Sequence, residues 1–177
     1  PLEGVKVVDL SVMISGPLAG MMLADQGADV VKVESPGLGD IMRFLGTNKG
    51  GMTGIFANNN RGKRSIVIDL KQPAGLDVAK RLIADADVVI QNFRPGVAAR
   101  LGIDEASLRA VRPDMIYVSV SGFGDSGPYA DQKSYDYVIQ ALSGMAALQG
   151  GDGAPQLVRN IVIDKVTAHT AAQSVMA

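Results

Sequence analysis

The sequence has no cysteine and only one histidine, His169. Without cysteine the chain can form no disulfide, no thiolate nucleophile and no zinc–thiolate site, and this composition is compatible with the cytoplasm, where we place the protein. A single histidine also argues against a Ser-His-Asp triad and against a metal centre built from several histidines. Thiol chemistry is excluded, and we expect no metal site.

Long apolar runs and an excess of one charge are also absent. No stretch approaches the ~18 to 20 uninterrupted apolar residues of a membrane span. The first residues lack the basic region and apolar core of a signal peptide. Seventeen basic and 18 acidic residues give a net charge of −1, so no global field draws the chain to nucleic acid or an anionic membrane. We expect neither partner, and any anion site must be local.

The length and composition fit one domain over residues 1–177. The chain is 47% hydrophobic and 20% charged, which is enough for a sizeable buried core. Two short β-branched runs, Val5–Leu10 and Asp29–Glu34, predict strands, and Gly16–Gly27 between them has helical spacing. We expect Pro17 at the first helical position and Gly27 as the C-terminal cap. This stretch does not fit the G-x-G-x-x-G pattern, which opposes a nicotinamide site.

The same alternation continues along the chain. Further strands are predicted at Lys63–Leu70, Ala86–Asn92 and Met115–Gly122. Further helices are predicted at Gln72–Ala84, Asp104–Val111 and Ser134–Leu148. Strands alternating with helices indicate a Rossmann-like α/β fold, with a doubly wound, mostly parallel sheet covered on both faces.

Residues Ser35–Arg61 interrupt this pattern. The segment is rich in glycine and asparagine and has little sustained periodicity, so we expect an irregular loop. Loops of such length inside a compact domain are usually functional or disordered. If the segment is ordered, Phe44, Ile55 and Phe56 are the residues expected to anchor it.

Asp164 is the sharpest candidate for chemistry. The apolar run before it predicts a strand, and Asp164–Met176 predicts a helix, so the carboxylate is expected at a strand-to-helix junction. Ligands and reactions in α/β sheets gather at such junctions. The alternative is a structural role, because aspartate caps helix N-termini and suits the positive end of the helix dipole. The residues alone leave both interpretations open.

Several polar residues follow the ends of the predicted strands. They are Lys71, Asn92, Arg94, Arg100 and Lys133. Each alone is most simply a solvated surface residue, but together they favour a ligand with several phosphates. In the turn Asn92–Gly96, Phe93 or Arg94 can stack on an adenine ring and Arg94 can bind a phosphate. A helix-start turn with Phe93 in the core explains the same turn equally well.

A series of short motifs resembles the family III CoA-transferases, the CaiB/BaiF group. The motifs are Val5–Leu10, Gly16-Pro17, Gly27–Glu34, Pro36–Asp40, Asn60–Ser65, Asn92–Gly96, Ser121–Gly124 and Gly127–Tyr129. Each one alone is weak, but together they cover essentially the whole chain in collinear order.

The resemblance implies an enzyme that moves CoA from an acyl-CoA thioester to a free carboxylic acid. Asp164 falls where the family's nucleophile stands, which reverses the preference for a capping role and implies anhydride and aspartyl-CoA thioester intermediates. No cofactor is expected to stay bound, since CoA and acyl-CoA are substrates. The implied CoA contacts are Ile68, Lys71, Asn92, Phe93, Arg94, Arg100 and Lys133, and Ile14 and Tyr135 are expected at the acyl group.

The resemblance also carries expectations about assembly. Family members are considerably longer and form interlocked homodimers, so the chain is expected to be the N-terminal half of the large domain. Two positions depart from the formyl-CoA transferases: Ile14 replaces a glutamine, and Ser35 replaces a basic residue. Both departures argue against oxalate or formyl specificity.

Two alternative functions use the same scaffold. An α-methylacyl-CoA racemase or epimerase would need a histidine before Asp136, where this chain has Tyr135, and tyrosine is a poor proton shuttle near neutral pH. His169 is expected to be a helix surface or core residue. A non-catalytic CoA-binding subunit would keep the phosphate contacts while Asp164 was dispensable. We favour the transferase.

Overall fold

Short β-branched runs form the centre of the protein. The computed structural model describes residues 1–177, and its main sheet has five strands in the order β5-β2-β1-β6-β7, all of them parallel. The strands are β1 (Lys6–Asp9), β2 (Asp29–Glu34), β5 (Arg64–Val67), β6 (Val88–Gln91) and β7 (Ile116–Ser119). The doubly wound α/β prediction is confirmed. The strand order reverses between β1 and β6, and this switch point is where such sheets bind ligands.

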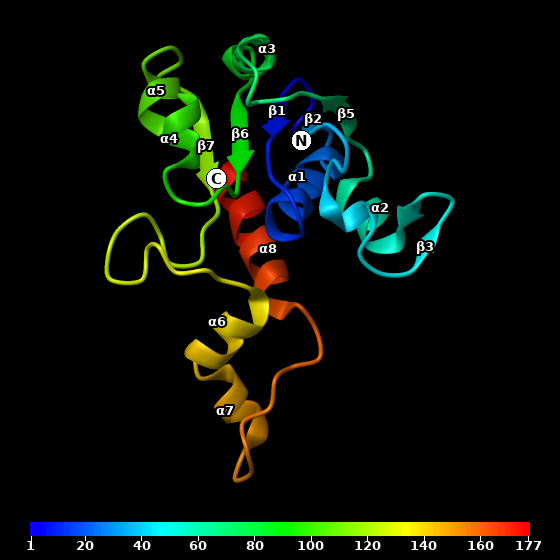
Figure 1. Cartoon of the computed structure of the whole chain (residues 1–177), viewed down its shortest axis with the longest axis vertical. Coiled ribbons are helices and arrows are strands. Elements are labelled where there is room, and N and C mark those ends of the chain that lie inside the picture. The colour runs from blue at the N-terminus through cyan, green and yellow to red at the C-terminus, as the bar shows by residue number, and fades with distance from the viewer.

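Alternate residues of the strands face two separate cores. Val7 of β1 packs with α1 (Ser15–Asp25) and α8 (Val162–Met176), whereas Val8 packs with α3 (Pro73–Ala84) and α5 (Glu105–Arg109). Figure 1 shows α8 beside α1 on one side of the sheet. The small residues Ala168 and Ala172 of α8 are almost fully buried there. A close α1–α8 contact therefore places the start of α8 near the start of α1.

The first helix differs slightly from the prediction. Helix α1 starts at Ser15, so Pro17 is its third residue and not its first. Gly27 follows the end of the helix with φ +102°, a conformation that glycine adopts without strain, so the predicted C-terminal glycine is confirmed. The start at Ser15 matters because it brings the hydroxyl of this residue to the helix N-terminus.

Residues 35–61 contain more regular structure than predicted. They form a 3-10 turn, η1 (Ile41–Arg43), a small hairpin of β3 (Asn48–Lys49) and β4 (Met52–Thr53), and α2 (Gly54–Asn60). Thr53 caps α2 by accepting a hydrogen bond from the Phe56 N–H. Phe56 is buried and anchors the segment as predicted, and Ile55 packs beside it, but Phe44 is half exposed and is not an anchor.

An ion pair joins this segment to the sheet. Both oxygens of the Glu34 carboxylate accept hydrogen bonds from Arg43, at 2.7 Å each, and Arg43 also lies over the Phe56 ring at 3.9 Å. Burial alone raises the pKa of Glu34. Hydrogen bonds from Arg43, Ser65 and the Asp40 N–H outweigh it and lower the pKa to about 2.

This shift predicts a loss of stability in acid. The ordinary pKa of glutamate, 4.5, falls to about 2 in the folded protein. A lowered carboxylate pKa contributes stability that is full above the unfolded value and is lost as the pH falls through the folded value. We therefore expect the free energy of unfolding to decrease between pH 4.5 and pH 2. Urea unfolding measured at several pH values across this range checks the expected decrease.

The matched variants for that measurement are Glu34→Gln and Glu105→Gln. Glu34→Gln should make the free energy of unfolding less dependent on pH and should lower it near neutral pH. The second breaks an exposed pair with Arg109, and exposed pairs contribute little. An unchanged pH profile in Glu34→Gln would contradict the assignment.

The last third of the chain departs from the prediction twice. The expected helix Ser134–Leu148 is divided at Gly144, which has φ +82°, into α6 (Asp136–Leu142) and α7 (Met145–Gly150). The expected strand before Asp164 is a loop, because its backbone binds the Gln140 side chain instead of a neighbouring strand. A short helix, α4 (Val97–Leu101), completes the fold. None of the helices combines the length and apolar character needed to cross a membrane.

Candidate active site

The loop after β1 and the turn after β6 meet at the switch point of the sheet. The Leu10 N–H donates to the Ile90 carbonyl at 2.8 Å. Two residues further along each segment, the Asn92 side chain accepts from the Val12 N–H at 2.9 Å and donates to the Val12 carbonyl at 2.7 Å. Asn92, a predicted CoA contact, therefore joins the loop after β1 to the turn after β6.

Asp164 lies directly beside this loop. It is the third residue of α8, and its Oδ1 accepts a hydrogen bond of 2.7 Å from the Ser15 hydroxyl at the start of α1. Its backbone N–H donates to Asp136 Oδ2 at 2.9 Å. The N-cap residue of α8 is Ile161 and no side chain caps the helix, so Asp164 is not an N-cap. Its place in the first turn still suits the helix dipole, the other part of the structural interpretation. The acid follows a loop and not a strand, yet it contacts Ser15 at the end of the loop that follows β1.

The carboxylate of Asp164 carries an uncompensated charge. Burial raises its pKa, the Ser15 hydrogen bond opposes this, and the nearby charge of Asp136 raises the pKa further. Asp164 takes part in none of the ion pairs of the chain. Its position in the first turn of α8 provides the favourable end of the helix dipole. The result is a half-buried carboxylate that is more basic than a solvated one.

A buried glutamine holds the segment that leads to Asp164. Gln140, on α6, is fully buried. Its side chain donates to Asp136 Oδ1 at 2.5 Å and to the Asn160 carbonyl at 3.0 Å, and it accepts from the Val158 N–H at 2.9 Å. Helix α6 therefore fixes both Asp136 and the entry to α8.

Sequence reasoning missed the roles of Ser15, Asp136 and Gln140. Two signals were available. Ser15 immediately precedes the Gly16-Pro17 motif, and Gln140 lies four residues after Asp136, the spacing of side chains on one helix face.

Gly16 allows the start of α1 to approach Ser11 in the loop after β1. A Cβ atom built at this position collides with the Cβ and Oγ atoms of Ser11. We expect Gly16→Ala to displace the loop, to lower the free energy of unfolding by about 1–3 kcal/mol and to lower any activity at Asp164. Gly54→Ala is the matched control, because a Cβ there meets nothing within 4 Å. Thermal unfolding of both variants checks this, and equal melting temperatures would contradict it.

The predicted cations are all available for a ligand. Lys71, Arg94, Arg100 and Lys133 are exposed and form no ion pair. Lys71 follows β5 and Arg94 follows β6, so both lie at the carboxyl end of the sheet. Arg100 is in α4, and Lys133 precedes α6. Their positions agree with the predicted phosphate contacts without testing them.

Two of the other predicted CoA contacts belong to the core. Ile68 is 6% exposed and sits in the core between the sheet and α3, which leaves only its backbone for a ligand. Phe93 is half-buried and packs against the same core, and Gly96 at φ +77° starts α4. The helix-start interpretation of the turn is thus confirmed, and the ligand contact of Phe93 stays a prediction.

The two predicted acyl-pocket residues are next to the partners of Asp164. Ile14 precedes Ser15 in the chain and packs with Met42 and Phe56. Tyr135 precedes Asp136, and 63% of its surface is exposed. Ile14 is only 6% exposed, so of the two side chains it is that of Tyr135 that is open to a ligand.

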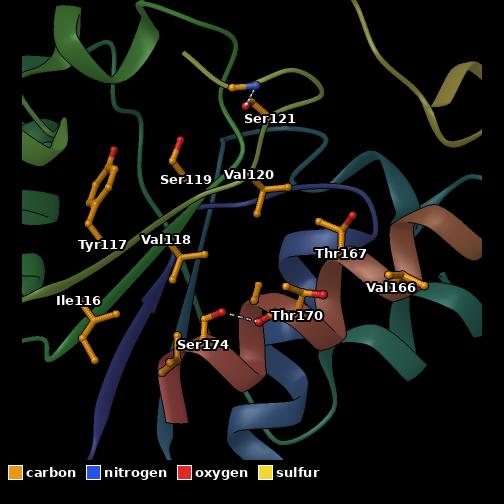
Figure 2. Close-up of a pocket in the computed structure, with 13 residues that line it drawn as sticks. Ile116, Tyr117, Val118, Ser119, Val120, Ser121, Val166, Thr167, Thr170 and Ser174 are labelled. Atoms are coloured by element: carbon orange, nitrogen blue, oxygen red, sulfur yellow. Dashed lines mark hydrogen bonds between the residues drawn. The ribbon is translucent and has the colours of Figure 1, made fainter. Parts of the chain in front are cut away.

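Two grooves run along α8, one on each side. The larger, about 580 Å³, lies between α8 and the edge strand β7. Figure 2 shows Thr167 and Thr170 of α8 near Val118 and Val120 of the strand segment. The smaller groove, about 480 Å³, is lined by residues of α1, α2 and α8, among them His169, and by residues that precede two of these helices, among them Ile14. His169 is exposed, as expected of a helix surface residue.

The chain resembles known proteins over its whole length. The family model for CoA-transferase family III matches residues 2–177. A succinate–glutarate CoA-transferase of Agrobacterium fabrum is 45% identical over 175 residues, which are 94% of this chain and 44% of that protein. An acetyl-CoA:oxalate CoA-transferase of Acetobacter aceti is 41% identical over 159 residues, 89% of this chain and 41% of that protein.

Solved structures agree with these relatives. A CaiB/BaiF family protein from Brucella suis superposes with a TM-score of 0.94 at 41% identity, and the match covers 99% of this chain and 48% of that one. Rv3272 from Mycobacterium tuberculosis gives a TM-score of 0.91 at 36% identity, with 99% and 49% covered. The chain spans about half the length of the curated relatives that it matches.

Proposed function

Because the chain belongs to CoA-transferase family III, we propose that the whole protein moves CoA from an acyl-CoA thioester to a free carboxylic acid, with Asp164 as nucleophile. One observation carries the proposal. Asp164 is a half-buried carboxylate with no cationic partner, hydrogen-bonded to Ser15 at the switch point of the sheet. A carboxylate needs no general base to attack, which suits a chain with no cysteine and one histidine.

The reaction proceeds by exchange at carbonyl carbons. Asp164 attacks the thioester carbonyl, a C–O bond forms, and the C–S bond breaks, which gives a mixed anhydride and the CoA thiolate. The thiolate attacks the Asp164 carbonyl, giving an aspartyl-CoA thioester and the free donor acid. The acceptor carboxylate attacks this thioester, and the thiolate then attacks the acceptor side of the new anhydride. Dividing the exchange in this way lowers each barrier.

The surroundings of Asp164 suit these steps. Partial burial raises its pKa and so its nucleophilicity, while the Ser15 hydrogen bond fixes the direction of one oxygen. The first N–H groups of α8 have no intrahelical acceptor. Such donors at a helix start can stabilise the oxyanion of a tetrahedral intermediate.

CoA itself would lie over the carboxyl ends of the strands. The unpaired cations Lys71, Arg94, Arg100 and Lys133 are the proposed partners of its phosphates, because phosphates bind best to charged, bidentate donors. Asn92, Phe93 and the Ile68 backbone would complete this side, and Ile14 and Tyr135 would contact the acyl group. No permanently bound cofactor is needed for the exchange.

The relatives indicate which substrates to try first. Their names include succinate, glutarate and oxalate, so a small dicarboxylate is a reasonable acceptor for this protein too. The test is to incubate the whole protein with succinyl-CoA and glutarate and to measure glutaryl-CoA by mass spectrometry. Formation of product supports the transferase. Exchange of the acyl α-proton in heavy water without CoA transfer would instead support a racemase, although Tyr135 stands where the racemase base would be.

We also propose the interlocked homodimer of the family for the whole protein. Helices α6 and α7 extend from the sheet (Figure 1) and expose apolar side chains, among them Leu142 at 64% and Leu148 at 85%. Exposed apolar surface of this kind is usually covered by another part of an assembly.

A further inference from the structure

Four charged side chains are buried under the loop that follows β1. Lys32 and Asp40 form one ion pair, with Nζ and Oδ2 3.0 Å apart, and Lys63 and Asp9 form another, with 2.8 Å between Nζ and Oδ2. Each of these side chains is at most 1% exposed. Burying charges is costly, and it is tolerated only where partners satisfy them. The mechanism proposed above uses none of them.

These side chains bind the backbone of the loop. Asp9 accepts hydrogen bonds from the Ser11 N–H and hydroxyl. Lys32 donates to the Ser11 carbonyl at 2.8 Å, and Asp40 Oδ1 accepts from the Met13 N–H at 3.2 Å. Asn92 binds both the N–H and the carbonyl of Val12. Each of the residues Ser11, Val12 and Met13 is therefore hydrogen-bonded to a side chain from another segment of the chain. Lys63 extends the set by donating to the Pro17 carbonyl at 2.7 Å.

The loop needs this support because Met13 is strained. Its φ of +73° lies in the left-handed region, and it is the only residue other than glycine that does so. Such a conformation costs free energy for a side chain with a Cβ and persists only where the surroundings hold it. Asp40 binds Met13, and two residues later Ser15 donates to Asp164.

We propose that the Lys32–Asp40 pair is a positioning device for the nucleophile: it fixes the loop Ser11–Ile14 so that Ser15 presents its hydroxyl to Asp164. This inference rests on the proposed role of Asp164. Asp40 Oδ2 is buried and has no hydrogen-bond partner, and the Lys32 ammonium is its ion-pair partner. The pair therefore works as a unit, and either residue alone would leave an unpaired buried charge.

The test removes the pair as a unit in the whole protein. Lys32→Met/Asp40→Leu removes both charges and both contacts to the loop. We expect its rate of Asp164 acylation by succinyl-CoA to fall about 10- to 100-fold, the range for losing a hydrogen bond to a charged group, while the dissociation constant for CoA stays within twofold. Lys32→Met/Asp40→Asn keeps an acceptor for Met13 and should recover most of the rate. An equal rate in the Leu and Asn variants would contradict the proposal.

A cycle with Ser15→Ala tests whether the pair acts through Ser15. Ser15→Ala alone should also slow acylation about 10- to 100-fold. Substitutions that disturb the same contact have non-additive effects. The variant that combines Ser15→Ala with Lys32→Met/Asp40→Leu should therefore be acylated no more slowly than the slower of the two separate variants. A multiplied loss would overturn the proposal. If the Leu variant does not fold, the same cycle is run with Lys32→Met/Asp40→Ala, which removes the same two contacts to the loop with a smaller side chain.

Two controls separate this proposal from the function on which it rests. The exposed pair Arg64–Asp29 joins β5 to β2, the strand that also carries Lys32. The variant Arg64→Met/Asp29→Asn should leave acylation unchanged. If the wild-type protein forms no adduct at Asp164 with any donor, the proposed function fails. If the wild type forms the adduct and the pair variant forms it equally fast, only the positioning role fails.

Discussion

An Asp164→Asn variant of the whole protein is expected to lose CoA transfer by about 10⁴-fold or more, because an amide cannot form the anhydride. The substitution preserves shape, and the amide oxygen can still accept the hydrogen bond from Ser15. The dissociation constant for CoA should therefore stay close to that of the wild type. Product formation from succinyl-CoA and glutarate, followed by mass spectrometry, gives the rate.

The same variant should be as stable as the wild type or more stable. Burial raises the pKa of Asp164 above its ordinary value of 3.8. A raised carboxylate pKa means that stability is full below 3.8 and is lost as the pH rises through the folded pKa. Asparagine has no such titration, so at pH 7 it avoids the cost of an ionised, half-buried acid. Thermal unfolding at pH 7 measures the difference.

The matched control is Asp152→Asn in the exposed turn after α7. It removes one carboxylate from a residue with no hydrogen-bonded partner and should change neither rate nor melting temperature. An Asp164→Asn variant that keeps a tenth or more of the wild-type rate would show that Asp164 is not the nucleophile.

Removing two of the unpaired cations should weaken CoA binding strongly. Lys71 follows β5 and Arg94 follows β6, two strands that β2 and β1 separate in the sheet, and neither residue has an acidic partner. A hydrogen bond to a charged group contributes about 1.5–3 kcal/mol, so Lys71→Ala/Arg94→Ala should raise the dissociation constant about 10²-fold or more. Isothermal titration calorimetry with CoA measures it. The dependence of affinity on salt should also become weaker, because fewer charges are screened.

Helix α3 supplies the control for this prediction. Lys71 precedes the helix, at the carboxyl end of the sheet, whereas Arg81 is in its last turn, at the opposite end. Arg81 is likewise exposed and unpaired. Arg81→Ala should therefore leave CoA affinity unchanged. An equal loss of binding free energy per charge removed in the two variants would mean that the cations act only through net charge.

The sheet was predictable from the sequence because its signals are local. Runs such as Asp29–Glu34 are β-branched and are bounded by turn residues, and the structure places β2 at the same residues. Residues 35–61 were not predictable in the same way. Their short hairpin and helix depend on side-chain contacts, the Glu34–Arg43 pair and the Thr53 cap, which hydrophobic periodicity does not reveal. The break at Gly144 depends on a left-handed conformation that a helical pattern does not reveal.

The candidate site was predictable only in part. The position of Asp164 follows from the resemblance, whereas periodicity alone left capping as the simpler interpretation. Its partner Ser15 lies 149 residues away in the chain, and nothing in the local sequence indicates such a contact. The buried Lys32–Asp40 pair was hidden for a related reason, because a lysine in a strand and an aspartate in a loop normally indicate surface positions.

The central claim is that Asp164 becomes covalently modified during turnover. The most direct measurement is to incubate the whole protein with succinyl-CoA, quench with hydroxylamine and analyse the peptide that contains Asp164 by mass spectrometry. Hydroxylamine converts an activated aspartyl group to a hydroxamate, so we predict this modification on Asp164 and its absence in Asp164→Asn. A protein that transfers CoA at the wild-type rate with Asp164 unmodified would contradict the claim.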